Sequence, residues 1–371
     1  MHHSTHDLLS PVPGIARQLH SFHFGPRGGR KVYIQASLHA DELPGMLVAW
    51  HLKQRLGELH KQGLLHREVI LVPVANPVGL EQVLLDAPLG RFELQSGENF
   101  NRNFVDLSDS IGDQVEQHLT QDPEHNVELI RDYLRRGLAV YPAATPLQSQ
   151  RLALQRLACD ADMVLDLHCD FEAVEHLYTT PEAWSQVEPL ARYLGAQASL
   201  LATDSGGQSF DECFSLLWWQ LQQRFGKRFP IPLGCFSVTL ELRGQADVSH
   251  DLASKDCQAI LDFLTHAGVI AGEAPELPEL PHAATPLAAV EPVVAPLGGL
   301  LVFHAKPGQY LEPGQLIAEV IDPLSDRVSA IRNTQAGLLY ARSVRRMATA
   351  GMVIAHVAGE HVCRSGYLLA N

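Results

Sequence analysis

The sequence is short of basic residues and of long apolar runs, and each shortage excludes a class of protein. Its 28 Lys and Arg residues stand against 42 Asp and Glu, which gives a formal net charge of −14. A general nucleic-acid binder needs clustered basic side chains to neutralise phosphates, so we expect no nucleic-acid partner. No stretch approaches the about 20 apolar residues that a helix needs to cross a bilayer, so we expect no membrane span.

Paired cysteine motifs and a signal peptide are also missing. The six cysteines show no Cys-x-x-Cys spacing and are interpreted as free, mostly buried thiols. The segment from Met1 to Ser10 is polar and rich in histidine, without the apolar core of a signal peptide. We therefore expect a cytoplasmic protein. Its oligomeric state stays open, and a homo-oligomer is compatible with the sequence.

The chain does contain enough apolar sequence for a large core. It has 371 residues, of which 46% are hydrophobic and 19% are charged, and this length favours a large domain with a smaller companion. Apolar strands are predicted at residues 30–37, 69–74 and 163–167, and helical periodicity at residues 39–56, 127–137 and 146–158. This alternation predicts an α/β domain with a mainly parallel or mixed sheet, whose ligands bind beyond the carboxyl ends of the strands.

A change in composition near Gly272 predicts a domain boundary. The segment GEAPELPELPHAATPLAAVEPVVAPL is rich in Pro, Ala and Glu, which disfavours regular structure. Beyond it, two similar strand–turn–strand segments begin at Gly298 and Ala336 and predict a small all-β barrel or sandwich similar to the biotinyl/lipoyl-type fold. The expected domains are residues 1–285 and a β-rich C-terminal domain of residues 286–371.

Three residues at strand ends form a candidate metal site. His39 and Glu42 have a His-x-x-Glu spacing between a strand and a helix, and His168 ends another apolar strand in VLDLHCD. Three such ligands with a fourth position left for water are typical of catalytic zinc. A strand-end histidine is also commonly a hydrogen-bonding residue without a metal. The same spacing at His125 and Glu128 is interpreted as a solvated helix face.

A carboxylate and a polar loop complete the candidate site. Glu241 interrupts the apolar strand VTLELRG, where it is either paired with Arg243 or acts as the general base and acid of a hydrolysis. Arg91, Asn101 and Arg102 lie in GRFELQSGENFNRNF, and their side chains suit an oxyanion partner and a carboxylate clamp. Residues 203–214, with adjacent glycines, predict either a mobile substrate loop or a turn before the next helix.

The order His-x-x-Glu, Asn-Pro, Asn-Arg, His and Glu resembles the zinc carboxypeptidase superfamily, and its succinylglutamate desuccinylase/aspartoacylase branch fits best. The resemblance implies a carboxypeptidase-like mixed-sheet domain and one zinc ion per chain, held by His39, Glu42 and His168. It further implies Glu241 as catalytic acid/base, Arg91 polarising the scissile carbonyl, and Asn101 and Arg102 binding a substrate carboxylate.

The expected activity is removal of the acyl group from a small N-acyl amino acid. Two alternatives stay open at this point. A metallocarboxypeptidase acting on peptides or peptidoglycan fragments would use the same metal and glutamate, and a non-catalytic binding or assembly protein would retain only the fold. The sequence does not reveal the acyl group or the amino acid, and zinc is inferred from the type of ligand.

Overall fold

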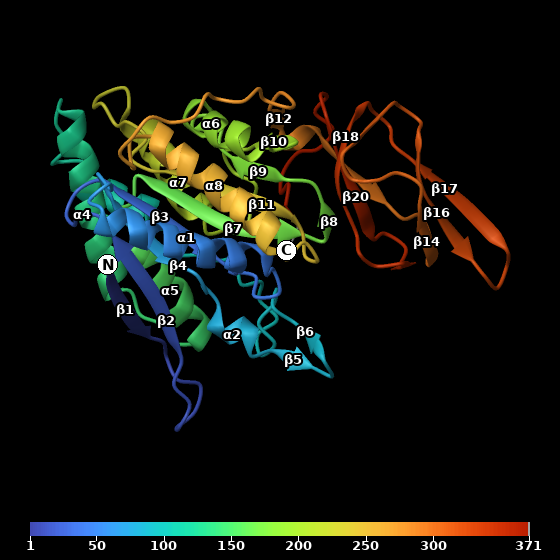
Figure 1. Cartoon of the computed structure of the whole chain (residues 1–371), viewed down its shortest axis with the longest axis horizontal. Coiled ribbons are helices and arrows are strands. Elements are labelled where there is room, and N and C mark those ends of the chain that lie inside the picture. Colours follow the sequence, from blue (N-terminus) through green and yellow to red (C-terminus); the bar gives the residue numbers. More distant parts are fainter. Residues whose placement is uncertain (370–371) are drawn as a thin grey trace.

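A mixed sheet dominates one part of the molecule, and smaller antiparallel sheets form the other (Figure 1). The computed structural model describes residues 1–369. Within these residues the large sheet has nine strands, in the spatial order β1 (His2–Asp7), β2 (Gln18–Phe24), β4 (Glu68–Val72), β3 (Lys31–Ala36), β7 (Met163–Asp170), β11 (Phe236–Gly244), β9 (His176–Thr179), β10 (Ala198–Leu201) and β12 (Thr285–Pro286).

The central strands of this sheet are parallel. β4, β3, β7 and β11 run in one direction, whereas β1, β2 and β9 each pair antiparallel with a neighbour. β9, β10 and β12 are again parallel to one another. The carboxyl ends of β3, β7 and β11 therefore meet at one edge of the sheet.

Helices cover both faces of the sheet because successive strand residues point to opposite sides. In β3, Val32 and Ile34 belong to one hydrophobic core and Tyr33 to the other. The first core includes α1 (Pro44–Lys61), α6 (Trp184–Leu194) and α8 (His250–His266). The second includes α3 (Ser108–Val115), α4 (Pro123–Val140), α5 (Pro146–Ala158) and α7 (Glu212–Phe225). Between β4 and α3 lie α2 (Pro77–Leu80), β5 (Val83–Leu84) and β6 (Ala87–Pro88).

Two antiparallel sheets share one core in the C-terminal region. The first contains β13 (Val290–Val294), β20 (Val353–Gly359), β18 (Gly337–Arg342) and β15 (Gln309–Leu311), preceded in the chain by the 3₁₀ helix η1 (Leu287–Ala289). The second contains β17 (Arg327–Arg332), β16 (Leu316–Asp322), β14 (Gly299–Phe303) and β19 (Met347–Ala348). Leu339 and Val357 of the first sheet and Val320 of the second are all buried in that core.

Each part of the molecule contributes a short strand to a sheet of the other. β8 (Glu172–Ala173) follows β7 in the chain but pairs with β18, where Ala173 lies opposite Ala341. β12 lies just before the C-terminal sheets and pairs with β10 of the large sheet. Glu172 also forms ion pairs with Arg342 at 2.7 Å and with Arg346 at 2.5 Å. The two parts are thus held together by backbone pairing and by charge.

The prediction of a mixed-sheet α/β fold with additional C-terminal β structure is confirmed. The strands and helices expected at residues 30–37, 69–74, 163–167, 127–137 and 146–158 correspond to β3, β4, β7, α4 and α5. A closed barrel and the division at residue 285 stay predictions. None of the helices in residues 1–369 combines the length and the hydropathy that a membrane span requires.

Candidate active site

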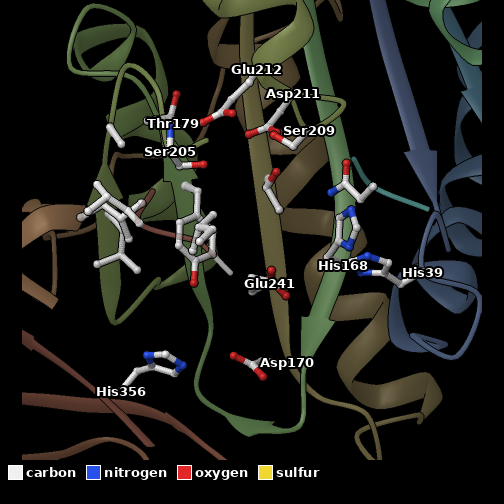
Figure 2. Close-up of a pocket in the computed structure, with 18 of the residues that line it drawn as sticks. His39, His168, Asp170, Thr179, Ser205, Ser209, Asp211, Glu212, Glu241 and His356 are labelled. Carbon is white, nitrogen blue, oxygen red and sulfur yellow. Dashed lines mark hydrogen bonds between the residues drawn. The ribbon is translucent and has the colours of Figure 1, made fainter. Parts of the chain in front are cut away.

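The predicted site residues gather at the carboxyl edge of the three neighbouring strands β3, β7 and β11. His39 follows β3, His168 lies near the end of β7, and Glu241 lies in β11 directly opposite His168 in the pairing register. Figure 2 shows the rings of His39 and His168 side by side, with the carboxylate of Glu241 facing the same pocket. The parallel arrangement thus brings together residues that are far apart in the sequence.

A sharp turn after β3 positions the first two candidate ligands. Ser37 has a φ of 61°, which is unusual for a non-glycine residue, and its hydroxyl donates to the carbonyl of Glu42 at 3.2 Å. The backbone N–H of Ala40 donates to the carbonyl of Gly90 at 2.9 Å. A Cβ at Gly90 would lie 2.2 Å from the backbone nitrogen of Asp41, so only glycine permits this approach.

His39, Glu42 and His168 form a group that can hold a metal ion. One ligand atom from each of these buried residues lies within 4.8 Å of the others. Nδ1 of His39 lies 2.9 Å from Oε1 of Glu42, and Nδ1 of His168 lies 2.7 Å from Oε2 of the same carboxylate. Two imidazole nitrogens and a carboxylate are the donor set of many catalytic zinc sites.

The other nitrogen of each ring faces a hydrogen-bond acceptor, as is usual for metal-binding histidines. Nε2 of His39 lies 2.8 Å from Oδ1 of Asn99, and Nε2 of His168 lies 3.0 Å from Oδ2 of Asp166. Asp166 in turn accepts from Gln35, whose carbonyl accepts from the hydroxyl of Tyr33. Protons on the two Nε2 atoms would leave both Nδ1 lone pairs directed at the carboxylate of Glu42, an arrangement that a cation between them stabilises.

The electrostatics of the three residues agree with this assignment. Burial and the neighbouring Arg91 lower the pKa of His39, which favours the neutral ring that binds metals. Burial opposes ionisation of Glu42, but His39 and His168 outweigh it and hold the pKa of that carboxyl far below its usual range. Burial likewise opposes protonation of His168, but Asp166 and Glu42 raise its pKa well above the ordinary value. The site therefore favours positive charge at its centre, and a divalent metal ion fits it.

Glu241 is held without the partner that would make it purely structural. Arg243, the neighbour considered from the sequence, instead pairs with Asp256 and Glu175. Within residues 1–369, Oε2 of Glu241 is buried and has no hydrogen-bond partner. Burial and the negative charge of Glu42 raise the pKa of Glu241 well above its usual value. A carboxyl group with a raised pKa in a pocket suits the exchange of protons near neutral pH.

Arg91, Asn101 and Arg102 line the same pocket. Nη1 of Arg91 lies 3.2 Å from Oε1 of Glu42, so the guanidinium reaches the metal-binding group. The side-chain oxygen of Asn101 accepts from the backbone N–H of Phe210 at 2.8 Å. Arg102 is 7% exposed and donates to the carbonyl of Asn101 at 2.7 Å. All seven residues predicted from the sequence thus lie at one site.

The pocket is a cavity of about 430 Å³, a volume that suits a small molecule. Its walls come from both parts of the chain. The large sheet supplies Tyr178 and Thr239, the C-terminal sheet supplies Tyr340 and His356, and the segment after β20 supplies Leu368. The backbone N–H of Leu368 donates to the carbonyl of Ser205 at 2.9 Å, which fixes that last segment against the loop before α7.

Other expectations from the sequence are also resolved. His125 and Glu128 are exposed at the start of α4, where Glu128 pairs with Arg131, as expected for a solvated helix face. The loop of residues 203–214 lines the pocket through Ser205 and Ser209 and leads into α7.

Several site residues had no recognisable signal in the sequence. Asn99 stands immediately before the aromatic-flanked Asn-Arg pair, and that position alone did not indicate its contact with His39. The pocket residues from β18 and β20 lie far from the motifs in the sequence and become visible only in the fold.

The comparisons with known proteins agree with the motifs. Residues 28–134 match the family model of the succinylglutamate desuccinylase/aspartoacylase catalytic domain. His39, Glu42, Arg91, Asn101 and Arg102 fall inside the matched range. None of the curated proteins matches the sequence.

Solved structures extend the likeness to nearly the whole chain. A succinylglutamate desuccinylase/aspartoacylase family protein of Shewanella amazonensis SB2B is 26% identical with a TM-score of 0.85, and the match covers 96% of this chain and 98% of that one. A protein of Shewanella frigidimarina NCIMB 400 with the same family name is 26% identical with a TM-score of 0.83, covering 96% of each chain. The product-bound ectoine utilization protein EutE (DoeB) of Ruegeria pomeroyi shares the fold, with 18% identity, a TM-score of 0.70 and coverage of 96% and 94%. The predicted resemblance to this hydrolase family is confirmed.

Proposed function

We propose that this chain, which resembles the succinylglutamate desuccinylase/aspartoacylase family in sequence and fold, is a zinc-dependent hydrolase that deacylates a small N-acyl amino acid. The observation that carries the proposal is the convergence of His39, Glu42 and His168 beside the unpartnered carboxylate of Glu241, in one small cavity. A deacylase needs both an electrophilic centre and a group that moves protons, and the site offers residues for each.

His39, Glu42 and His168 would hold one zinc ion per chain. When bound, zinc would polarise the acyl carbonyl and lower the pKa of a coordinated water towards neutrality. Glu241 would accept a proton from the attacking water as its oxygen bonds to the acyl carbon. The same carboxyl group would then protonate the amine nitrogen as the amide C–N bond breaks, releasing a free carboxylate and a free amine.

The basic residues of the pocket would bind the charged parts of the substrate. Arg91, whose guanidinium reaches Glu42, is placed to donate a hydrogen bond to the oxyanion that develops on the acyl carbonyl. Asn101 and Arg102 would hold the carboxylate of the amino acid, for which guanidinium has a matching bidentate geometry. The C-terminal walls of the cavity favour a small substrate over a peptide, because the enclosed volume leaves little room for a longer chain.

Metal content and hydrolysis measured together test this proposal. We expect purified protein supplied with zinc to hold about one zinc ion per chain and to hydrolyse members of a panel of N-acetyl and N-succinyl amino acids. His168→Ala should lose both the ion and the activity. His125→Ala is the matched control, because His125 has the same His-x-x-Glu spacing but is exposed on α4. Protein that binds no zinc and turns over no member of the panel would refute the proposal.

A further inference from the structure

Two acidic residues line the pocket at the end formed by the loop before α7, and the proposed reaction does not use them. Figure 2 shows Asp211 and Glu212 gathered there with Ser205 and Ser209, whereas Asp170 and His356 lie at the opposite end and Glu241 lies between. This end of the cavity also contains Asn101 and Arg102 on its wall. A site built only to bind an anion would exclude carboxylates from the neighbourhood of its arginine.

Glu212 is buried without a cationic partner of its own. The residue is 6% exposed, and its Oε1 accepts from the backbone N–H of Ser205 at 2.5 Å. Its Oε2 is buried and has no hydrogen-bond partner within residues 1–369. Burial, reinforced by Asp211, raises the pKa of Glu212 to about 7. A carboxylate in this position is costly unless a positive group binds to it.

The neighbouring Asp211 is held rigidly and faces the same cavity. Its Oδ1 accepts from the hydroxyl of Ser209 at 2.5 Å. Its backbone carbonyl accepts from the hydroxyls of Ser237 at 2.7 Å and Ser215 at 3.2 Å. The two carboxylates are therefore fixed before any ligand arrives, which lowers the entropy cost of binding one.

Arg102 does not cancel the charge of this pair. Burial and Arg91 lower the pKa of Arg102, and the negative charges of Asp211 and Glu212 act against them. Two carboxylates thus lie near one guanidinium. With all three groups ionised, this end of the pocket carries an excess of one negative charge, next to the group proposed to bind a carboxylate.

We propose that the substrate carries a free ammonium group as well as its carboxylate, and that Asp211 and Glu212 bind this ammonium while Arg102 binds the carboxylate. The chemical class is a diamino acid acylated on one of its two amines. This inference rests on the proposed deacylase function and makes its substrate class more specific. Both carboxylates would form charge-assisted hydrogen bonds to the ammonium, and the partnerless Oε2 of Glu212 would gain a donor.

A simpler role for the pair would be to stabilise the positive end of the α7 dipole, since both residues lie at the start of that helix. Acidic residues also begin α3, α4 and α8, as Asp109, Glu124 and Asp251, and all three are exposed. Glu212 differs because it is buried against a cavity. The dipole role predicts an effect on stability alone, whereas the ammonium site predicts an effect on substrate choice.

Two matched substrate pairs separate these roles. Nα-acetylornithine differs from Nα-acetylnorvaline only by a side-chain ammonium, and Nδ-acetylornithine differs from 5-acetamidopentanoate only by an α-ammonium. With zinc-loaded protein, we expect the ammonium-bearing member of at least one pair to have a kcat/KM at least about tenfold higher, as expected for hydrogen bonds to charged groups. Ratios near one in both pairs would overturn the inference while the deacylase function stands.

Two variants test whether the pair is responsible. Asp211→Asn and Glu212→Gln should each reduce the selectivity ratio about tenfold, with little change for the substrate that lacks the ammonium. Asp251→Asn is the control, because it removes a first-turn acid from α8 far from the pocket and should leave the ratio unchanged. A ratio that stays at the wild-type value in both pocket variants would overturn the assignment.

Direct binding keeps the inference testable if no acyl amino acid is hydrolysed, an outcome that would refute the deacylase function itself. Ornithine and norvaline would then be titrated into the zinc-loaded protein by calorimetry. Tighter binding of ornithine that is lost in Glu212→Gln would support the ammonium site. Equal or undetectable binding of the two amino acids would overturn it.

Discussion

At the scale of single residues, Glu241 tests the chemistry of the site most directly. Its carboxyl group is proposed to move protons without binding the metal, so Glu241→Gln should separate catalysis from metal binding. We expect kcat to fall by about 10²- to 10⁴-fold, the usual contribution of general acid–base catalysis, with zinc content unchanged. Metal analysis and steady-state kinetics on the same preparation check both points. Retained activity would remove Glu241 from the mechanism.

Glu212 gives a prediction about pH and stability. Its pKa is raised by burial to about 7 from a model value of 4.5, so between these values the folded state holds a proton that the unfolded state has lost. The contribution of Glu212 to stability is therefore greatest below pH 4.5 and is lost as the pH rises to about 7. The change amounts to at most about 3 kcal/mol.

Glu212→Gln removes this titration. The variant should gain stability relative to wild type as the pH rises from about 5 to 7, and the gain should level off above that. Urea unfolding of both proteins across this range measures the difference, in which the other titrating groups cancel. A difference that does not change with pH would show that Glu212 is ionised throughout and contradict the prediction.

At the scale of secondary-structure elements, the contact of α1 with β7 controls the distance between metal-binding residues. Glu42 precedes α1 and His168 lies in β7. A Cβ at Gly45 would lie 2.8 Å from the carbonyl oxygen and 2.9 Å from the Cβ of Leu167, so this helix can pack closely only with glycine there. Gly45→Ala should push the helix away, cost about 1–3 kcal/mol of stability and weaken zinc binding.

Gly57 is the matched control in the same helix. The nearest atom to a Cβ there is Cε1 of Phe24 at 3.9 Å, an ordinary contact. Gly57→Ala should therefore raise stability by about 0.5–1 kcal/mol through helix propensity and leave zinc affinity unchanged. Thermal unfolding and zinc titration of both variants provide the comparison. Equal effects of the two substitutions would mean that close packing at Gly45 is not what positions Glu42.

The elements that hold the metal ligands could be predicted from the sequence because their signals are local. β3 and β7 are apolar runs ending at polar residues, and the motif spacing placed His39, Glu42 and His168 at those ends. β8 and β12 could not be predicted, because strands of two residues are defined by their partners and not by their own composition. Asp211 and Glu212 looked like ordinary first-turn residues, and only their burial against the cavity distinguishes them.

At the scale of the whole molecule, Glu172 links the catalytic part to the C-terminal sheets. It lies in β8 and pairs with Arg342 and Arg346, and β18, which carries Arg342, also carries the pocket residue Tyr340. Glu172→Ala should cost about 1 kcal/mol, because the ion pairs are only partly buried. It should also raise KM several-fold with zinc content unchanged, since the wall formed by β18 loses an anchor.

Glu188→Ala serves as the control for this prediction. Glu188 pairs with Arg192 within α6 and does not line the pocket, so its loss should affect stability slightly and KM not at all. Michaelis–Menten kinetics and urea unfolding distinguish the two variants. Identical KM values for wild type and Glu172→Ala would show that the wall stays in place without this link.

The exchange of β8 and β12 between the two parts also has a consequence for synthesis on the ribosome. Translation produces His39, Glu42, His168 and Glu241 well before β18 and Leu368, so the metal ligands can assemble while the walls of the cavity are still missing. β8 must wait for β18, its partner far along the chain, and such distant pairings form slowly. A nascent chain would thus present an open site that becomes a selective cavity only when the last walls are added.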